Sequence, residues 1–327
     1  MSRSATIPAR PIHRLALLGT LALAVTLAAC QDALQPLAPT DAAQAAKGGP
    51  GKPGSGEAVL FSGTRDGNAD IYRMNPDGSN VRRLTTDTLN DEFPDFAPDG
   101  RTFVWARVNS AGLGELFTAN ADGSKQTPLT NMGTTVLHPR YSPDGTKIAF
   151  VAFSTDGGQH DIYTVNADGT GLHRLTYETS LDLSPSWSPD GTQIAFESNR
   201  SGLPLIHVMN ADGLNTRQLE GCVNGACGEP AWSPDGEWIA MTVPGGAIRA
   251  LNIAGKFSTP VGPLFPNGVS QHPTWSKDGT RVLFASTRGI EGTFEVYAGI
   301  PGTSDPTTVR RLTVFSPGRA LSPSYSH

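Results

Sequence analysis

Residues Pro185-Ser-Trp-Ser-Pro-Asp-Gly191 form one of five near-copies of a motif that recurs along this chain, and a partial sixth copy follows near the C-terminal end. The copies begin at Pro94, Pro139, Pro185, Pro230, Pro273 and Pro323. Successive copies are 45, 46, 45, 43 and 50 residues apart. A regular repeat of this length, with several short strands in each unit, is typical of a β-propeller.

Each unit reads as four short strands joined by tight turns. In the third unit Pro189-Asp-Gly191 favours a turn, because Pro presets φ and Gly accepts the left-handed conformation. Apolar segments at 193–198 and 205–209 predict two further strands. The turn Asn210-Ala-Asp-Gly213 then leads to a short outer strand. Proline removes a hydrogen-bond donor, so the motif strand is expected at the inner edge of its sheet, along a central channel.

The two ends of the repeat region predict how the ring closes. The region starts near Glu57 with a strand of the second type, Val59-Leu-Phe-Ser62, which has no motif strand before it. The partial copy Pro323-Ser-Tyr-Ser326 supplies the missing strand. We therefore predict an all-β, six-bladed β-propeller of four-stranded blades, whose last strand completes the first blade and removes an open sheet edge.

The repeats resemble the TolB-like β-propeller family, in which Pro-x-Trp-Ser-Pro-Asp-Gly is followed by an Ile-Ala-Phe strand and an Ile-Tyr strand. The matching residues here are Ile148-Ala-Phe150, Ile194-Ala-Phe196, Asp70-Ile-Tyr72 and Asp161-Ile-Tyr163. The resemblance covers residues 57–327 and implies one propeller domain. It does not extend to the α/β domain that precedes the propeller in TolB, for which the chain is expected to have no room.

Residues 1–29 predict a secretory signal, because three arginines and no acidic residue accompany an apolar run from Leu15 to Leu27. The run is too short to span a bilayer comfortably. It ends in Leu27-Ala-Ala-Cys30, which resembles a bacterial lipobox and implies that Cys30 becomes the lipidated first residue of the mature protein. The alternative is an ordinary Ala-rich signal that happens to end at a cysteine.

Residues 30–56 are rich in Ala, Pro and Gly and predict a flexible tether with a mean reach of about 25–30 Å. We therefore expect an exported protein that contacts the membrane through its lipid anchor only. Gln31, rather than Asp, follows the cysteine. In an organism with two membranes this resembles the pattern for sorting to the outer membrane, with the protein facing the periplasm.

The charge balance argues against a nucleic-acid partner. Without the three arginines of the signal, the mature chain has 22 basic and 30 acidic residues, a net charge of −8. Nucleic-acid binding depends on clustered Lys and Arg, and the sequence has no basic stripe. We expect a monomer that binds an envelope protein or peptide. Because nucleophile-elbow, His-Glu-x-x-His and phosphate-loop motifs are missing, we predict no cofactor.

Two cysteines remain after the signal, in Cys222-Val-Asn-Gly-Ala-Cys227 between two blades. In an exported protein an isolated pair of this kind predicts a disulfide. A redox-active pair is an alternative, although such pairs usually enclose two residues rather than four. A zinc site is another, although only Glu229 lies near enough in sequence to act as a further ligand.

The residue before each motif proline is expected at a mouth of the channel. Around the ring these residues are Phe93, His138, Ser184, Glu229, His272 and Ser322. His138 and His272 are three blades apart, so we expect them on opposite sides of the channel and predict no shared metal. Asp91, Asp182 and Arg319 in the preceding loops would add charge to this polar rim.

We interpret the rim as the binding surface of a non-catalytic module. Because an unperturbed imidazole charges near pH 6.5, affinity for a partner is expected to change between about pH 5.5 and 7.5. One alternative is that the rim residues are merely solvated loop residues. The alternative function is a carbohydrate-active or other metal-assisted enzyme that uses His138 and His272.

Overall fold

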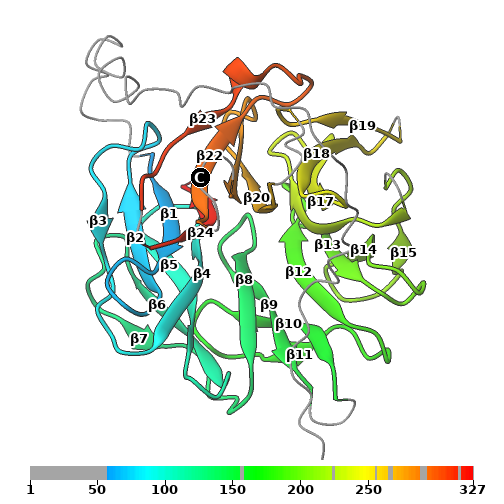
Figure 1. The fold of residues 1–327 in the computed structure, drawn as a ribbon. Coiled ribbons are helices and arrows are strands. Elements are labelled where there is room, and N and C mark those ends of the chain that lie inside the picture. Colours follow the sequence, from blue (N-terminus) through cyan, green and yellow to red (C-terminus); the bar gives the residue numbers. More distant parts are fainter. Residues whose placement is uncertain are drawn as a thin grey trace, which may run out of the picture. The chain divides into compact units, whose positions relative to one another are not determined.

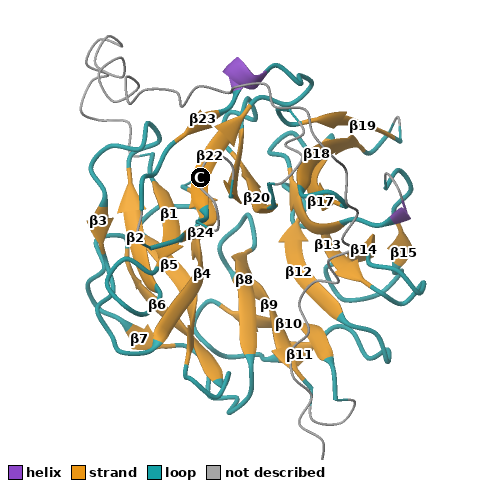
Figure 2. Cartoon of the chain, viewed as in Figure 1, coloured by secondary structure: helices purple, strands orange, loops and turns teal. Residues whose placement is uncertain are grey.

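The computed structural model describes residues 57–326, apart from 155–157, 223–224, 255, 264–267, 288–292 and 316–317. Strands β1 to β24 form six four-stranded sheets, which stand around a common centre as the blades of a ring (Figure 1). Figure 2 shows that strands and loops make up almost all of this part of the chain. No helix among the described residues is long and apolar enough to cross a membrane. The predicted signal and tether lie outside the described residues.

Each blade runs from an inner strand, which begins the motif, to a two- to four-residue outer strand. Blade 1 consists of β24 (Ala320–Tyr325), β1 (Val59–Gly63), β2 (Asp70–Met74) and β3 (Arg82–Arg83). Blade 2 consists of β4 (Asn90–Phe96), β5 (Thr102–Val108), β6 (Gly114–Asn120) and β7 (Thr127–Pro128). Blade 3 consists of β8 (Val136–Tyr141), β9 (Lys147–Phe153), β10 (His160–Asn166) and β11 (His173–Arg174). Blade 4 consists of β12 (Asp182–Trp187), β13 (Gln193–Ser198), β14 (Leu205–Asn210) and β15 (Arg217–Gln218). Blade 5 consists of β16 (Gly228–Trp232), β17 (Trp238–Val243), β18 (Ala247–Asn252) and β19 (Phe257–Pro260). Blade 6 consists of β20 (Ser270–Trp275), β21 (Val282–Ser286), β22 (Glu295–Gly299) and β23 (Arg310–Arg311).

The last strand closes the ring as predicted. β24 pairs antiparallel with β1, with Val59 opposite Tyr325 and Gly63 opposite Ala320. The backbone N–H of Ala58 also donates to Oγ of Ser326 at 2.7 Å. In Figure 1 the two ends of the repeat region, red and blue, lie side by side in one sheet. The six-bladed propeller with this closure is therefore confirmed.

Apolar clusters between neighbouring blades hold the ring together. Because side chains alternate along a strand, β1 contributes Val59 and Phe61 to the cluster shared with blade 6 and Leu60 to the cluster shared with blade 2. In the first cluster Phe61 meets Phe315 edge to face, with ring centroids 5.2 Å apart. The described residues form six such clusters, one at each interface between blades. The core is therefore distributed around the ring.

A bulge at the residue before the motif proline shapes every inner strand. Phe93, His138, Ser184, Glu229, His272 and Ser322 have φ values between 49° and 55°. The pairing register with the neighbouring strand shifts at these points. The left-handed conformation costs a non-glycine residue roughly 1–2 kcal/mol. A bulge re-aims a side chain, and here it brings residues of different blades together at the channel.

The Asn-Ala-Asp-Gly turns pack against the blade before them. Gly123 has φ +86°, and a Cβ at this position would lie 2.8 Å from the carbonyl oxygen of Leu84 in blade 1. The same approach recurs between Gly169 and Leu129, at 2.7 Å, and between Gly213 and Leu175, at 2.9 Å. Glycine recurs in these turns because neighbouring blades come too close for a side chain, in addition to its tolerance of positive φ.

Replacing Gly123 by Ala should therefore destabilise the propeller more than replacing Gly112 by Ala. Gly112 lies in the same blade with φ +79°, but a Cβ there meets no atom within 4 Å. Both variants carry the cost of a left-handed alanine, and only Gly123→Ala adds an overlap, which typically costs about 1–3 kcal/mol. Chemical denaturation of both variants measures the difference. Equal losses of unfolding free energy would contradict close packing between blades 1 and 2.

Candidate functional site

Aromatic rings from three blades meet at the centre of the channel. The ring of Phe93 lies 4.1 Å from that of His138 and 5.5 Å from that of His272, measured between centroids. The two imidazoles are 5.8 Å apart. These rings narrow the channel close to the face that carries the connections between blades, which we call the connection face. The opposite face, which carries the turns at 97–100, 142–145, 188–191, 233–236 and 276–279, we call the motif face.

His138 and His272 lie on opposite sides of the channel, as predicted, but closer together than a wide channel would allow. The channel is so narrow that their rings nearly touch. Each Nδ1 lies 3.3 Å from a serine hydroxyl, Ser184 for His138 and Ser322 for His272. Within the part of the chain that the structure describes, no three His, Cys, Asp or Glu side chains are grouped as metal ligands.

Glu229 completes this constriction. One carboxylate oxygen accepts a hydrogen bond of 2.6 Å from the backbone N–H of His272, and the other lies 3.6 Å from Nε2 of the same residue. The two side chains are only 23% and 12% exposed. Burial raises the pKa of Glu229 to about 7, although the His272 N–H and the charge of Arg140 lower it in part.

The same burial disfavours charge on the imidazoles. It lowers the pKa of His272 to about 3, with a further contribution from the positive charge of Arg140. It also lowers the pKa of His138 well below its usual value, and His272 and Arg140 act in the same direction. Burial therefore disfavours charging of the two histidines between pH 5.5 and 7.5, and the dependence of partner affinity on pH stays a prediction. Glu229 is the group of the constriction that titrates near neutrality.

Glu229→Gln should stabilise the protein at pH 8 relative to the native chain. The pKa of this carboxyl is near 4.5 in the unfolded state and higher in the folded state. Below pH 4.5 the group therefore does not reduce the free energy of unfolding, and the reduction grows as pH rises toward 7. The variant should be about 2–3 kcal/mol more stable at pH 8 and nearly equal at pH 4.5. Denaturation curves of both proteins at the two pH values test this. A constant difference across pH would show that Glu229 is not held protonated.

Three other residues of the predicted rim do not take part in this constriction. Asp91 is fully buried and forms a bidentate ion pair with Arg107, whose Nε and Nη2 lie 2.7 and 2.9 Å from the two carboxylate oxygens. Asp182 is buried too and pairs with Arg200 at 2.9 Å. Arg319 is exposed, and its backbone N–H donates to Oγ1 of Thr64. The prediction that they form a common binding rim with the histidines is wrong, because the two aspartates serve ion pairs within their own blades.

The two cysteines are bonded to each other in the connection that precedes β16. The Cα atoms of Cys222 and Cys227 are 5.6 Å apart. The backbone N–H of Cys227 donates to the carbonyl oxygen of Pro204 at 3.0 Å, in the loop before β14. Cys227 also belongs to the apolar cluster between blades 4 and 5. The bond therefore fixes a connection on the connection face and does not line the channel.

A second layer of side chains follows one step along the inner strands, toward the motif face. It consists of Asp95, Arg140, Ser186, Ala231, Thr274 and Ser324, the variable second residue of each motif copy. Asp95 is satisfied, because its carboxylate accepts from the backbone N–H of Tyr141 at 2.8 Å and from Oγ of Ser324 at 2.9 Å. Arg140 is the basic residue of this layer. It also lines the cavity beside His138, Glu229 and His272, whose volume of about 10 Å³ suits about one water molecule.

On the motif face the channel widens into a funnel of about 260 Å³. Its walls are aromatic residues and prolines of the motif copies, with Arg140 and Asp95 deeper inside; the lining includes Tyr141, Trp187, Trp232, Trp275, Pro98, Pro143, Pro189, Pro234, Pro273 and Lys277. Trp187 and Trp275 are nearly buried, and each indole N–H donates to a carbonyl oxygen of the preceding blade. Trp232 instead donates to Gly236 of its own turn and is more exposed.

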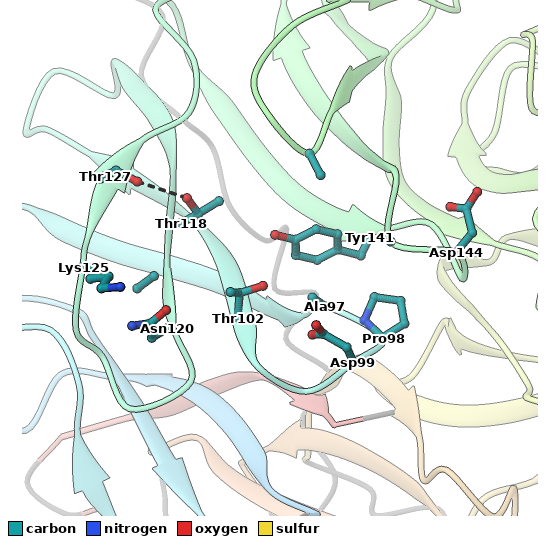
Figure 3. Close-up of a pocket in the computed structure, with 13 residues that line it drawn as sticks. Ala97, Pro98, Asp99, Thr102, Thr118, Asn120, Lys125, Thr127, Tyr141 and Asp144 are labelled. Atoms are coloured by element: carbon teal, nitrogen blue, oxygen red, sulfur yellow. Dashed lines mark hydrogen bonds between the residues drawn. The ribbon is translucent and has the colours of Figure 1, made fainter.

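A polar groove adjoins the funnel between blades 2 and 3 (Figure 3). It has a volume of about 740 Å³, and it shares Pro98 and Tyr141 with the funnel. In Figure 3 the Tyr141 ring lies between Thr102 and Asp144, with Pro98 beneath it. Hydroxyl and amide groups of Thr102, Thr118, Asn120 and Thr127 line the groove further out. Funnel and groove therefore lie next to each other on the motif face, with Pro98 and Tyr141 at their common border.

We did not predict this surface from the sequence, where only the strand and the turn of the motif were considered. The second position of the motif did carry a signal. Read down the copies, it is Asp, Arg, Ser, Ala, Thr and Ser, so one blade alone places a basic side chain in the channel. That position varies while its neighbours repeat, which is the expected pattern for a residue that serves a ligand rather than the fold.

Comparison with known proteins shows which family and which individual proteins this chain is similar to. The model of the TolB beta propeller domain matches residues 41–154 and 129–243, more than half of the chain. An uncharacterized protein of Agrobacterium fabrum, Atu1656, is 33% identical over 107 residues, which are 32% of this chain and 36% of that protein. The Tol-Pal system protein TolB of Thioalkalivibrio sulfidiphilus is 39% identical over 61 residues, 19% of this chain and 14% of that protein.

Among solved structures, TolB from Acinetobacter baumannii superimposes with a TM-score of 0.69 at 17% identity, over 82% of this chain and 66% of that one. At this identity the superposition shows a shared fold. The chain thus matches 66% or less of the length of each of these proteins.

Proposed function

Because this chain belongs to the family of TolB β-propeller domains, we propose that it is a lipid-anchored module of the cell envelope that binds a partner protein or peptide without catalysis. The names of its relatives support the envelope part of this proposal, since two of them are Tol-Pal system proteins. The lipobox-like Leu27-Ala-Ala-Cys30 supports the anchor. The acidic net charge of the mature chain agrees with a partner other than nucleic acid.

The observation that carries the binding proposal is the aromatic and proline-lined funnel on the motif face. Trp and Tyr supply most of the binding energy in many protein interfaces, because their large rings lose little conformational entropy when they are covered. The funnel gathers three Trp and one Tyr side chains in about 260 Å³. That volume suits a few residues of an extended segment rather than a folded domain. A peptide, or a projecting loop of a partner protein, is the ligand that fits.

The geometry of the histidines weighs against the alternative enzyme. His138 and His272 meet Phe93 edge to face in a constriction beside a cavity of about 10 Å³. A sugar ring is many times larger than this cavity. Burial also lowers the pKa of both imidazoles, and each has a serine hydroxyl partner. The pair therefore serves better as a plug of the channel than as a site that receives a saccharide.

Trp232→Ala should weaken peptide binding about tenfold or more, because its ring is the most exposed of the funnel tryptophans. Short random peptides displayed on phage provide the probe, and affinities of selected peptides are then measured for native and variant protein. Trp238→Ala is the matched control, since that indole packs against Phe257 outside the funnel. Selected peptides that bind Trp232→Ala as tightly as the native protein would contradict the funnel as the binding surface.

The lipid anchor is tested separately. Cys30→Ser should shift the protein from the membrane fraction to the soluble exported fraction, because the sulfur that would carry the acyl chains is gone. Cell fractionation with immunodetection measures the distribution. Retention of the variant in the membrane fraction would mean that something other than acylated Cys30 holds the protein there.

A further inference from the structure

We propose that the funnel recognises a carboxylate of its peptide ligand, held by Arg140, and that the peptide chain leaves the funnel through the groove between blades 2 and 3. This inference rests on the proposed function, and it adds the chemistry of the ligand and its path. It starts from two observations, a guanidinium with spare donors and a groove that borders the funnel.

Arg140 is half-buried in the channel, where a charged group normally needs a partner. Its Nη1 donates to the carbonyl oxygen of Pro139 at 3.0 Å. Within the described residues no carboxylate oxygen approaches its side chain to 4.0 Å. A guanidinium has five N–H donors in a planar fork. Most of the hydrogen-bonding capacity of Arg140 is therefore free for a ligand.

Three other half-buried arginines differ from Arg140, while Arg249 is half-buried and bonds to Ser258 instead of an acid. Arg83, Arg107 and Arg200 each pair with a buried aspartate, at distances of 2.7, 2.7 and 2.9 Å. These pairs stabilise individual blades. Arg140 has no such partner within its blade, although it is surrounded by protein to a similar degree. A residue that carries the cost of burial without an internal ion pair is a candidate for contact with a ligand anion.

The two acids nearest along the channel do not take the place of that ligand. Asp95 accepts hydrogen bonds on both of its oxygens from Tyr141 and Ser324. Glu229 faces the His272 backbone, and its carboxyl stays largely protonated up to about neutral pH because it is buried. Lys277 at the exposed rim adds a second positive charge to the funnel lining. The described funnel lining therefore has two positive side chains, Arg140 and Lys277, against the negative Asp95, so its charge balance favours an anion by one unit.

A carboxylate fits this floor and is an anion that a peptide can supply. The guanidinium fork binds a carboxylate through two parallel hydrogen bonds, which gives direction as well as affinity. The tryptophan and proline walls above it suit apolar or aromatic side chains next to the carboxylate. The hydroxyl and amide groups of Thr102, Thr118 and Asn120 in the groove can then bind the backbone of the emerging chain.

The carboxylate can come from a peptide C-terminus or from an Asp or Glu side chain, and three synthetic peptide pools separate these sources. The first has free C-termini and no acidic residue, the second has amidated C-termini and one Asp or Glu, and the third has neither. Each pool is selected on the full chain, and bound peptides are identified by mass spectrometry. The affinity of each selected peptide is then compared with that of its counterpart in which the carboxylate is an amide.

With the native protein, the carboxylate form should bind about tenfold or more tightly than its amide counterpart. Arg140→Gln should reduce this ratio to about one and leave the affinity for the amide unchanged, whereas Arg140→Lys should keep part of the preference. Arg281→Gln is the control, since Arg281 lines a groove of the same face between blades 6 and 1 and is not part of the funnel lining. Thermal unfolding of each variant verifies that the ring is intact.

A carboxylate preference that persists in Arg140→Gln would overturn the role of Arg140. Equal affinity of the native protein for carboxylate and amide forms would overturn the inference, while tryptophan-dependent binding of the neutral pool would leave the proposed function standing. Failure of all three pools to bind would contradict both. Preferential binding of acidic oligosaccharides such as oligogalacturonate would replace the peptide with another class of ligand and also overturn the inference.

Discussion

The pairing of β24 with β1 is the constraint on which the rest of the structure depends. It joins residues 257 or more positions apart into one sheet, and it brings blade 6 against blade 1 so that the cluster around Phe61 and Phe315 can form. Only a closed ring makes all six inner strands converge on one axis. The convergence in turn sets the width of the channel, and the bulge before each motif proline then directs one side chain per blade into it.

The convergence explains why the two faces of the channel differ. Near the connection face the six bulged residues meet, and Phe93, His138 and His272 fill the space between them. Toward the motif face the strands end in turns, and the side chains that follow are aromatic rings and prolines at the edge of an open funnel. The protein therefore presents one mouth narrowed by the buried rings of Phe93, His138 and His272 and one mouth with the more exposed Trp232 and Tyr141 at its edge.

The fold could be predicted from the sequence because its determinants are local and repeated. Each motif copy encodes its own strand and turn, and the misplaced sixth copy encodes the closure of the ring. The site could not be predicted in the same way. The distance between His138 and His272 depends on the radius of the channel, which no single repeat encodes. Asp91 and Asp182 form ion pairs with Arg107 and Arg200 on neighbouring strands or turns. Their positions in the sequence predicted an exposed rim, but both aspartates are buried in these pairs. Arg140 could have been singled out from the sequence, since it stands at a variable position within an otherwise regular motif.

The central claim is that a partner docks on the motif face. Photo-crosslinking in living cells tests it most directly, with a benzophenone amino acid placed at Pro234 on the exposed rim of the funnel or at Leu203 on the exposed connection face. We expect a discrete crosslinked adduct from position 234 that disappears when Trp232 is also replaced by Ala, and no such adduct from position 203. An adduct from position 203 with none from position 234 would show that the partner binds the opposite face.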